Sequence, residues 1–374
     1  MKHRLATSLA VSMFFASAGC ALLAGVDGER HIGQETATST ASSTSSSGTG
    51  GSGGQAPVCS LALPPTPPTT TDAGGADVLT FALREVDLGG PKKKVGFDLD
   101  GQCTCAGKTG CQEPVWAEAD HCDDPDGRDN GAGNAFATIN AAFGAVISSV
   151  QLSDQAYKGK WSVLVKLSGY NGGDDDDQVE VALYTTPGTG AFTPKWDGMD
   201  AWPVAPTSLL DSMSLDMPVE KDPKAYVTNR VLVAHLPTAT VVFQGSGVHL
   251  EFKLSSAIFS ATLAAKDTGA VELTAGTLSG SWTEPELFKS LSGLRVNGGM
   301  NLCIGDTYYH PVKKALCDEI DLSSTGKSSD PCDALSFSVG FEASPAMLMG
   351  VVAFDPLSGA CDPAKDPATD LCGS

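Results

Sequence analysis

Apolar and polar residues alternate with a period of two through the middle of the chain. From Val248 to Leu254 every second residue is apolar, and the residues between them are His, Glu and Lys. Such alternation is typical of β-strands with one buried face. The pattern predicts further strands at residues 78–86, 95–100, 161–167, 179–184, 227–234, 240–244, 257–263, 271–273 and 277–282.

Helical periodicity is confined to three short stretches. Apolar residues recur at helical spacing from Phe136 to Val150, behind Asn134 as a candidate cap. Residues 285–291 and 311–320 each begin with proline, which suits the first turn of a helix. Many short strands with few helices predict a mainly β fold, namely an antiparallel sandwich or jelly roll with a few short helices. Because the helix expected at 311–320 carries Cys317, we also expect a disulfide-tied C-terminal helical segment.

The first 76 residues have a different character. A basic start (Lys2–Arg4) precedes an apolar run over residues 5–18 that is too short to span a bilayer. The run ends in Ser-Ala-Gly-Cys20, which resembles the lipobox of bacterial lipoproteins and predicts a signal peptide at 1–19 with lipidation of Cys20. Simple secretion after cleavage at Ala18 is the alternative.

The segment after Cys20 is suited to a tether. Residues 35–56 are almost wholly Ser, Thr, Gly and Ala, and a proline-rich stretch follows at 64–69. We therefore expect a tether over 20–76 and a single β-rich domain over 77–374. Because Ala21 and not Asp follows the cysteine, the sorting rule that the lipobox implies places the anchor in the outer membrane.

The formal charge of the whole chain is −20, from 24 basic and 44 acidic residues. A strongly acidic protein repels nucleic acid and anionic membrane surfaces, which excludes nucleic acid as a predicted partner. The same charge is compatible with cation binding. The predicted partners are therefore a membrane, reached through the lipid anchor, and a glycan or protein ligand.

Ten cysteines remain beside Cys20, an even number that predicts up to five disulfides in an exported chain. They form an insert at 103–122, a C-terminal group at 303–372 and one isolated residue: Cys59, Cys103, Cys105, Cys111, Cys122, Cys303, Cys317, Cys332, Cys361 and Cys372. Because the late group holds five, we expect bridges mainly within each group and Cys59 bonded to the late one. The rival interpretation of the insert is a four-thiolate zinc site, although no C-x-x-C pair occurs.

Two acidic D-x-D-G turns are the strongest chemical signal. They begin at Asp98 and Asp124, and carboxylates on a sharply turning backbone are the ligands that Ca²⁺ prefers. The predicted ligands of a structural Ca²⁺ ion are Asp98, Asp100, Asp124, Asp126 and Asp129. The alternative is turn and helix-cap chemistry, which uses the same residues. A second acidic run, residues 174–177, is expected at the solvated tip of a hairpin.

Trp196 and Trp202 are candidate ligand-binding residues, because aromatic rings stack on the apolar faces of sugars. Packing in the core is the alternative for both. No nucleophile elbow in a usable context, metalloprotease motif or triad spacing occurs. The sequence therefore predicts a non-catalytic protein, and the alternative is an exported polysaccharide hydrolase with two carboxylates about 5–9.5 Å apart.

Several runs taken together resemble a known group of proteins. They are residues 95–101 (VGFDLDG), 125–130 (PDGRDN), 164–172 (LVKLSGYNG) and 177–184 (DQVEVALY). They resemble a family of exported, often lipid-anchored β-rich proteins from soil bacteria of the myxobacterial type, over residues 80–320. The resemblance implies location and architecture only. The resulting prediction is a cell-envelope lipoprotein that presents a Ca²⁺-stabilised β-domain to a glycan or protein.

Overall fold

The structure is a computed structural model. It describes residues 62–69, 74–90, 94–102, 104, 110–117, 122–123, 126–144, 147–245, 248–266, 269–296, 300–353 and 361–373. Residues 56–374 form one compact unit that is separate from residues 1–55. The predicted lipidation site Cys20 and the predicted site residues Cys59, Cys103, Cys105 and Asp124 lie outside the described residues.

Strands make up most of the described unit. They are β1 (Asp77–Asp87), β2 (Val163–Tyr170), β3 (Asp176–Thr185), β4 (Ala201–Val204), β5 (Glu220–Thr228), β6 (Val231–Gly245), β7 (Val248–Ala265), β8 (Val271–Thr283), β9 (Arg295–Val296), β10 (Met300–Asn301), β11 (Ala334–Pro345) and β12 (Met347–Val351). The helices are α1 (Gly131–Phe143), α2 (Ser149–Tyr157), α3 (Glu284–Gly293) and α4 (Tyr309–Cys317), with short 3-10 turns η1 (Pro206–Ser208), η2 (Pro363–Lys365) and η3 (Pro367–Thr369).

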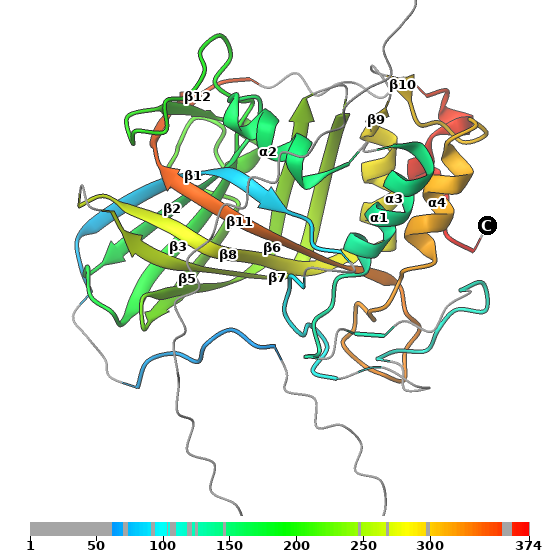
Figure 1. The fold of residues 1–374 in the computed structure, drawn as a ribbon, viewed down its shortest axis with the longest axis horizontal. Helices are drawn as coiled ribbons and strands as arrows, with labels where there is room; N and C mark the ends of the chain where they lie inside the picture. Colours follow the sequence, from blue (N-terminus) through cyan, green and yellow to red (C-terminus); the bar gives the residue numbers. More distant parts are fainter. Residues whose placement is uncertain are drawn as a thin grey trace, which may run out of the picture. The chain divides into compact units, whose positions relative to one another are not determined.

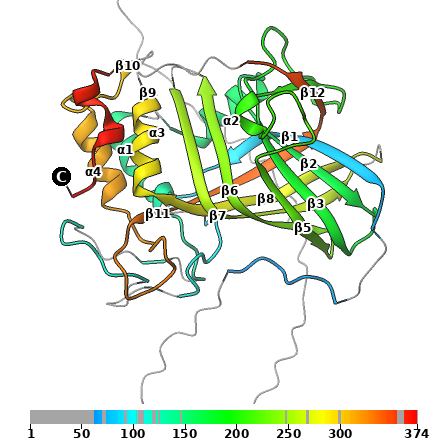
Figure 2. The same cartoon turned by 180° about the vertical axis from the view of Figure 1, so that it is seen from behind.

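The main sheet is antiparallel and closes on itself. Its strands follow the order β7-β6-β5-β3-β2-β1-β11-β8, and β8 also pairs with β7. Figure 1 shows α1, α3 and α4 together at one end of this sheet, and Figure 2 shows the same grouping from behind. The predicted mainly β, antiparallel fold with a few short helices and a disulfide-tied C-terminal helical segment is confirmed.

The interior of the closed sheet is aromatic. Phe252 on β7 is fully buried, and its ring centroid lies 4.6 Å from that of Phe337 and 4.8 Å from that of Trp282. Alternate residues of the surrounding strands point into the same core, as a period of two requires. Because the strands of the main sheet all pack on this core, the sheet curves around it until β7 pairs with β8.

A second layer covers the outer face of β1, β2 and β3. The short strands β4 and β12 pair in parallel there, with Leu348 opposite Trp202. Trp202 packs on outward-facing residues of the main sheet, including Leu164 and Tyr184. The main sheet is thus buried on both faces in this region, which explains the nearly continuous apolar run of β3.

The structure corrects several predicted boundaries. Residues 248–254 and 257–263 belong to one bulged strand, β7, and residues 271–273 and 277–282 belong to one strand, β8. Residues 227–234 are interrupted by a turn at Asn229 and Arg230, which both have positive φ. Residues 95–100 pair with no described strand, and α1 is capped by Asn130 and not by Asn134.

The end of the predicted tether contacts the unit. The backbone N–H of Ala62 donates to Asp126 O at 3.0 Å, and Asp98 N donates to Ala62 O at 3.0 Å. Tyr226 Oη donates to Pro65 O at 2.6 Å. The boundary predicted at residue 77 therefore lies too late in the chain.

Three disulfides have both partners among the described residues: Cys111–Cys332, Cys303–Cys361 and Cys317–Cys372. Cys122 is disulfide-bonded as well. The late group therefore bonds outside itself through Cys332, as its odd number requires, but to Cys111. All five late cysteines are used in these bridges, so the prediction that Cys59 bonds to this group is wrong. The oxidised state of Cys111 and Cys122 also rules out the four-thiolate zinc site.

The acidic run at 174–177 is more than a solvated tip. Asp176 is buried and accepts a hydrogen bond from Asn171 N at 2.8 Å. Asp175 accepts one from Asn229 N at 2.8 Å, and Asp174 lies 3.7 Å from the guanidinium of Arg230. The run therefore fixes the β2–β3 turn to the β5–β6 turn.

Glu220 on β5 is expected to make stability depend on pH. It is buried, and burial raises its pKa above the ordinary 4.5, although hydrogen bonds from Thr240 act against that rise. A raised pKa in the folded state means that stability present at low pH is lost as the pH rises through the raised value. Urea unfolding between about pH 4 and 7 should show this loss, and Glu220→Gln should reduce it. Parallel pH profiles for wild type and variant would contradict the assignment.

Among the residues that the structure describes, none of the helices combines the length and the apolar character needed to cross a lipid bilayer.

Candidate metal centre

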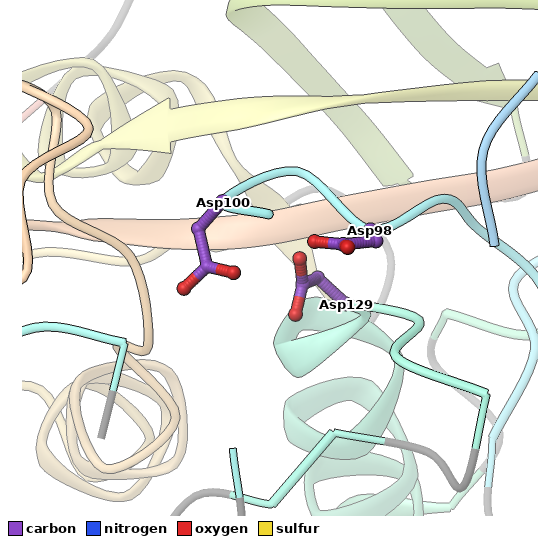
Figure 3. A group of neighbouring side chains, drawn as sticks. All are labelled: Asp98, Asp100 and Asp129. Atoms are coloured by element: carbon purple, nitrogen blue, oxygen red, sulfur yellow. The ribbon is translucent and has the colours of Figure 1, made fainter. Parts of the chain in front are cut away.

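Three aspartates meet beside the N-terminus of α1, outside the closed sheet. Asp98 and Asp100 come from the 94–102 segment, and Asp129 comes from the turn before the helix (Figure 3). One carboxylate oxygen of each lies within 4.8 Å of those of the other two. Figure 3 shows the three side chains turned toward one another.

Local backbone hydrogen bonds hold these carboxylates. Gly101 N donates to Asp98 Oδ1 at 2.7 Å, and Leu99 N donates to Asp129 Oδ2 at 2.7 Å. Gln102 N donates to Asp100 Oδ1 at 2.8 Å. Gly101 has a φ of 75°, which glycine adopts without strain. The D-x-D-G sequence thus makes a turn that directs two carboxylates toward Asp129.

The outer face of β11 positions Asp129. Ser338 Oγ donates to Asp129 O at 2.9 Å, and Ser338 N donates to the side chain of Asn130 at 3.1 Å. A Cβ at Gly96 would lie 2.5 Å from Ser338 Oγ and 2.9 Å from Asp129 O, so only glycine fits there. The segment before the site and α1 are therefore both fixed to the same strand.

Two of the three carboxylates are buried. Asp98 is 3 % exposed and Asp129 is 2 % exposed. Asp98 Oδ2 is buried and has no hydrogen-bond partner among the described residues. A buried carboxylate oxygen without a partner is strongly destabilising unless a cation or proton neutralises it. A cation bound between the three aspartates would supply the partner that Asp98 Oδ2 lacks among the described residues.

The electrostatic environment disfavours the ionised carboxylates. Burial, and then the charges of Asp321 and Asp123, raise the pKa of Asp129 to about 10. Burial and the nearby charges of Asp123 and Asp98 raise the pKa of Asp100 to about 6, despite the hydrogen bond from Gln102. Burial also raises the pKa of Asp98. A divalent cation among these groups would reverse the repulsion.

The donor set fits Ca²⁺. Two oxygens on opposite sides of a Ca²⁺ ion lie about 4.6–5.2 Å apart, which is twice the usual bond length, and the three carboxylates fall within that span. Mg²⁺ usually keeps several waters and takes one or two carboxylates, so a buried group of three favours the larger ion. Soft metals would require sulfur or imidazole ligands.

Of the predicted ligands that the structure describes, Asp98, Asp100 and Asp129 come together, and Asp126 is not part of this group. Asp126 Oδ2 lies 2.6 Å from Arg128 Nε. Burial opposes ionisation of Asp126, but the hydrogen bond and charge of Arg128 outweigh it and hold its pKa below the ordinary value. Asp126 therefore already has a cationic partner.

Sequence reasoning missed Asp123 and Asp321. The charge of Asp123 acts on every member of the cluster, and the charge of Asp321 acts on Asp129. Asp321 also accepts hydrogen bonds from Ser336 N and Ser336 Oγ on β11. No local motif identifies either residue as part of the site. Asp321 is far from Asp129 in the sequence, and only the path of the chain into β11 brings the two together.

The predicted aromatic platform is not formed as a pair. Trp202 is 0 % exposed and packs under β12, so its ring offers no face to a ligand, and this prediction is wrong. Trp196 is partly buried, and its ring lies between those of Tyr157 and Trp202, each with a centroid 5.6 Å away. Its indole N–H donates to Tyr157 O at 3.2 Å.

Comparison of the chain with protein-family models, with curated proteins and with solved structures finds no match in any of the three. The resemblance to exported proteins of the myxobacterial type therefore stays a prediction.

Proposed function

We propose that the protein is an exported, lipid-anchored protein of the cell envelope whose unit 56–374 is a non-catalytic binding module stabilised by Ca²⁺. Asp98, Asp100 and Asp129 would hold the ion. The observation that carries the proposal is the convergence of these carboxylates around the buried, unpartnered Asp98 Oδ2. A bound ion would join the 94–102 segment to the start of α1.

Burial favours a structural role for the site over a catalytic one. A polysaccharide hydrolase must present both carboxylates to a large substrate, whereas Asp98 and Asp129 are covered. Trp196 packs with the β4–β12 layer, on elements different from those that carry the aspartates. The carboxylates and the aromatic side chain that a hydrolase would combine thus come from different parts of the fold.

The disulfides support export. Bridges of this kind form and persist in oxidising compartments and are rare in the cytosol. Three are described, and each joins segments at least 55 residues apart. Such bridges suit a protein that works outside the cytoplasm, and the proposed outer-membrane anchor at Cys20 agrees with this setting.

Thermal unfolding with and without Ca²⁺ tests the proposal. At a Ca²⁺ concentration of 100 times Kd the native state gains about 2.7 kcal/mol, so the melting temperature should rise by about 5 °C over that in chelator. Asp98→Asn should abolish this rise. The same variant should melt above wild type in chelator, because it removes a buried charge and keeps the Oδ1 acceptor for Gly101.

Asp126→Asn is the matched control for that experiment. It changes a carboxylate five residues before the helix start but outside the cluster, so its calcium response should equal that of wild type. Superimposed melting curves of the wild type with Ca²⁺ and with chelator would contradict the proposal.

Mass spectrometry of the mature protein tests the anchor. We expect a chain that begins at Cys20 and carries the added mass of acyl groups. Cys20→Ser should remain uncleaved or leave the membrane fraction, while the fold of unit 56–374 stays unchanged. An unmodified mature chain that begins at Gly19 would contradict the lipid anchor and leave the calcium site untouched.

A further inference from the structure

Five of the eight methionines of the chain are exposed around the β4–β12 layer, two of them on β12 and three in the segments that precede and follow β4. Their exposed fractions range from 41 % to 83 %. This surface, called the methionine face below, consists of Met199, Met213, Met217, Met347 and Met349, with Phe192, Leu210, Val219 and Val352. In both views β12 lies far from α1, α3 and α4, so this face is distant from the helical end (Figures 1 and 2).

Strand pairing gathers these residues. Met347 pairs with Ala201 and its N–H donates to Asp200 O at 2.9 Å, which places Met199 beside the start of β12. Leu348 points inward to the buried layer, so Met347 and Met349 point outward. Leu210 N donates to Met217 O at 2.8 Å, and this contact brings Met213 and Met217 into one hairpin-like turn.

The layer beneath is complete without the methionines. Trp202, Val204 and Leu209 are buried and already fix β4 and the following turn to the main sheet. Nor does any described strand pair with the outer edge of β12. An exposed apolar strand edge is a template for the pairing of another extended chain. Methionine side chains adapt their shape to different apolar partners.

The charges around the methionine face favour a partner that carries basic residues. Residues 190–219 contain four aspartates and one lysine; Asp200 is buried and Asp216 lies 3.3 Å from Lys166, which leaves Asp197 and Asp211. Asp197 and Asp211 accept hydrogen bonds only from the backbone N–H groups of Met199 and Met213, and neither forms an ion pair among the described residues. A second copy of the chain would bring like charges together, and anionic lipid would be repelled.

We propose that the methionine face binds an extended, apolar polypeptide segment of another protein that carries basic residues at its ends. The segment adds as a strand to the free edge of β12. Its alternate apolar side chains contact Met347 and Met349, and its basic ends lie near Asp197 and Asp211. The inference rests on the proposed function in that it names the partner class of the binding module. It does not depend on the calcium site.

Fluorescence anisotropy with a synthetic peptide tests the inference on the full-length mature chain. The probe is a labelled nine-residue peptide that alternates valine with threonine and has arginine at both ends. We expect saturable binding that weakens in high salt, and at least about tenfold weaker binding by the double variant Met347→Gln, Met349→Gln. Glutamine keeps the length of methionine and removes its apolar character.

Three controls test whether binding depends on the methionine face, on strand pairing and on the calcium site. Val115→Gln removes an exposed valine of the 110–117 segment, which the Cys111–Cys332 bridge ties to the segment before β11, and should bind the probe like wild type. A peptide with proline in place of threonine should not bind, because proline cannot pair with a strand edge. The methionine variant should keep the melting shift with Ca²⁺, so failure of this inference and failure of the calcium site are distinguishable.

Four results would overturn the inference. They are no binding of the probe, equal binding by the methionine variant, concentration-dependent dimers of wild type that the variant lacks, and partitioning of wild type onto phosphatidylcholine vesicles that the variant loses. The third would assign the face to a second copy of the chain, and the fourth would assign it to a lipid surface.

Discussion

Replacing Cys111 and Cys332 together with alanine is expected to lower the free energy of unfolding by about 5 kcal/mol. The bridge joins positions 221 residues apart, and both side chains are buried. A cross-link over so long a loop restricts the unfolded chain strongly. Urea unfolding of the oxidised protein and of the double variant measures the difference.

The Cys303–Cys361 bridge provides the comparison. It closes a loop with a separation of 58 residues, so its removal should cost about 1 kcal/mol less than removal of Cys111–Cys332. Equal losses, or the opposite order, would contradict the account of the Cys111–Cys332 bridge. The Cys111 bridge also holds residues 110–117 against the segment before β11, beside Asp100.

Phe252→Ala is expected to lower the free energy of unfolding by about 3–5 kcal/mol. Phe252 is fully buried, and four other rings surround it, with centroids between 4.6 and 6.0 Å away. These rings come from β6, β8, β11 and α1, which pack tightly around Phe252, so the cavity collapses only in part. Chemical unfolding measures the loss.

Val78→Ala on β1 is the control for Phe252→Ala, because Val78 is exposed at the start of its strand. Its change in stability should stay below about 1 kcal/mol. A small loss for Phe252→Ala, comparable to that of the control, would mean that the aromatic interior of the closed sheet contributes little.

The alternation of apolar residues predicted strand type better than strand length. Ser256 and Ala275 adopt positive φ inside β7 and β8, and the bulges there shift the alternation by one residue. Each long strand therefore looks like two short ones in the sequence. Residues 334–345, which form β11, were not among the predicted strands, although Leu335, Phe337 and Val339 alternate with small polar residues and this pattern itself indicates a strand.

The candidate site was partly predictable for the same reason. Asp98 and Asp100 alternate in sequence before Gly101, so a local turn suffices to orient them. Asp129 lies directly before Asn130, the N-cap of α1, and it was predicted because it follows the second D-x-D-G turn. Asp126 differs because Arg128, only two residues away, pairs with it. The disulfide partner of Cys111 depends on the path of β11 and is not a property of local spacing.

Isothermal titration calorimetry of the chelator-treated protein with CaCl₂ measures cation binding at the three aspartates. We expect one Ca²⁺ ion per chain for wild type and for Asp126→Asn, and no measurable binding for Asp98→Asn or Asp100→Asn, all four being folded in chelator. Absence of heat in wild type, or binding that survives in both Asp98→Asn and Asp100→Asn, would contradict the proposed site.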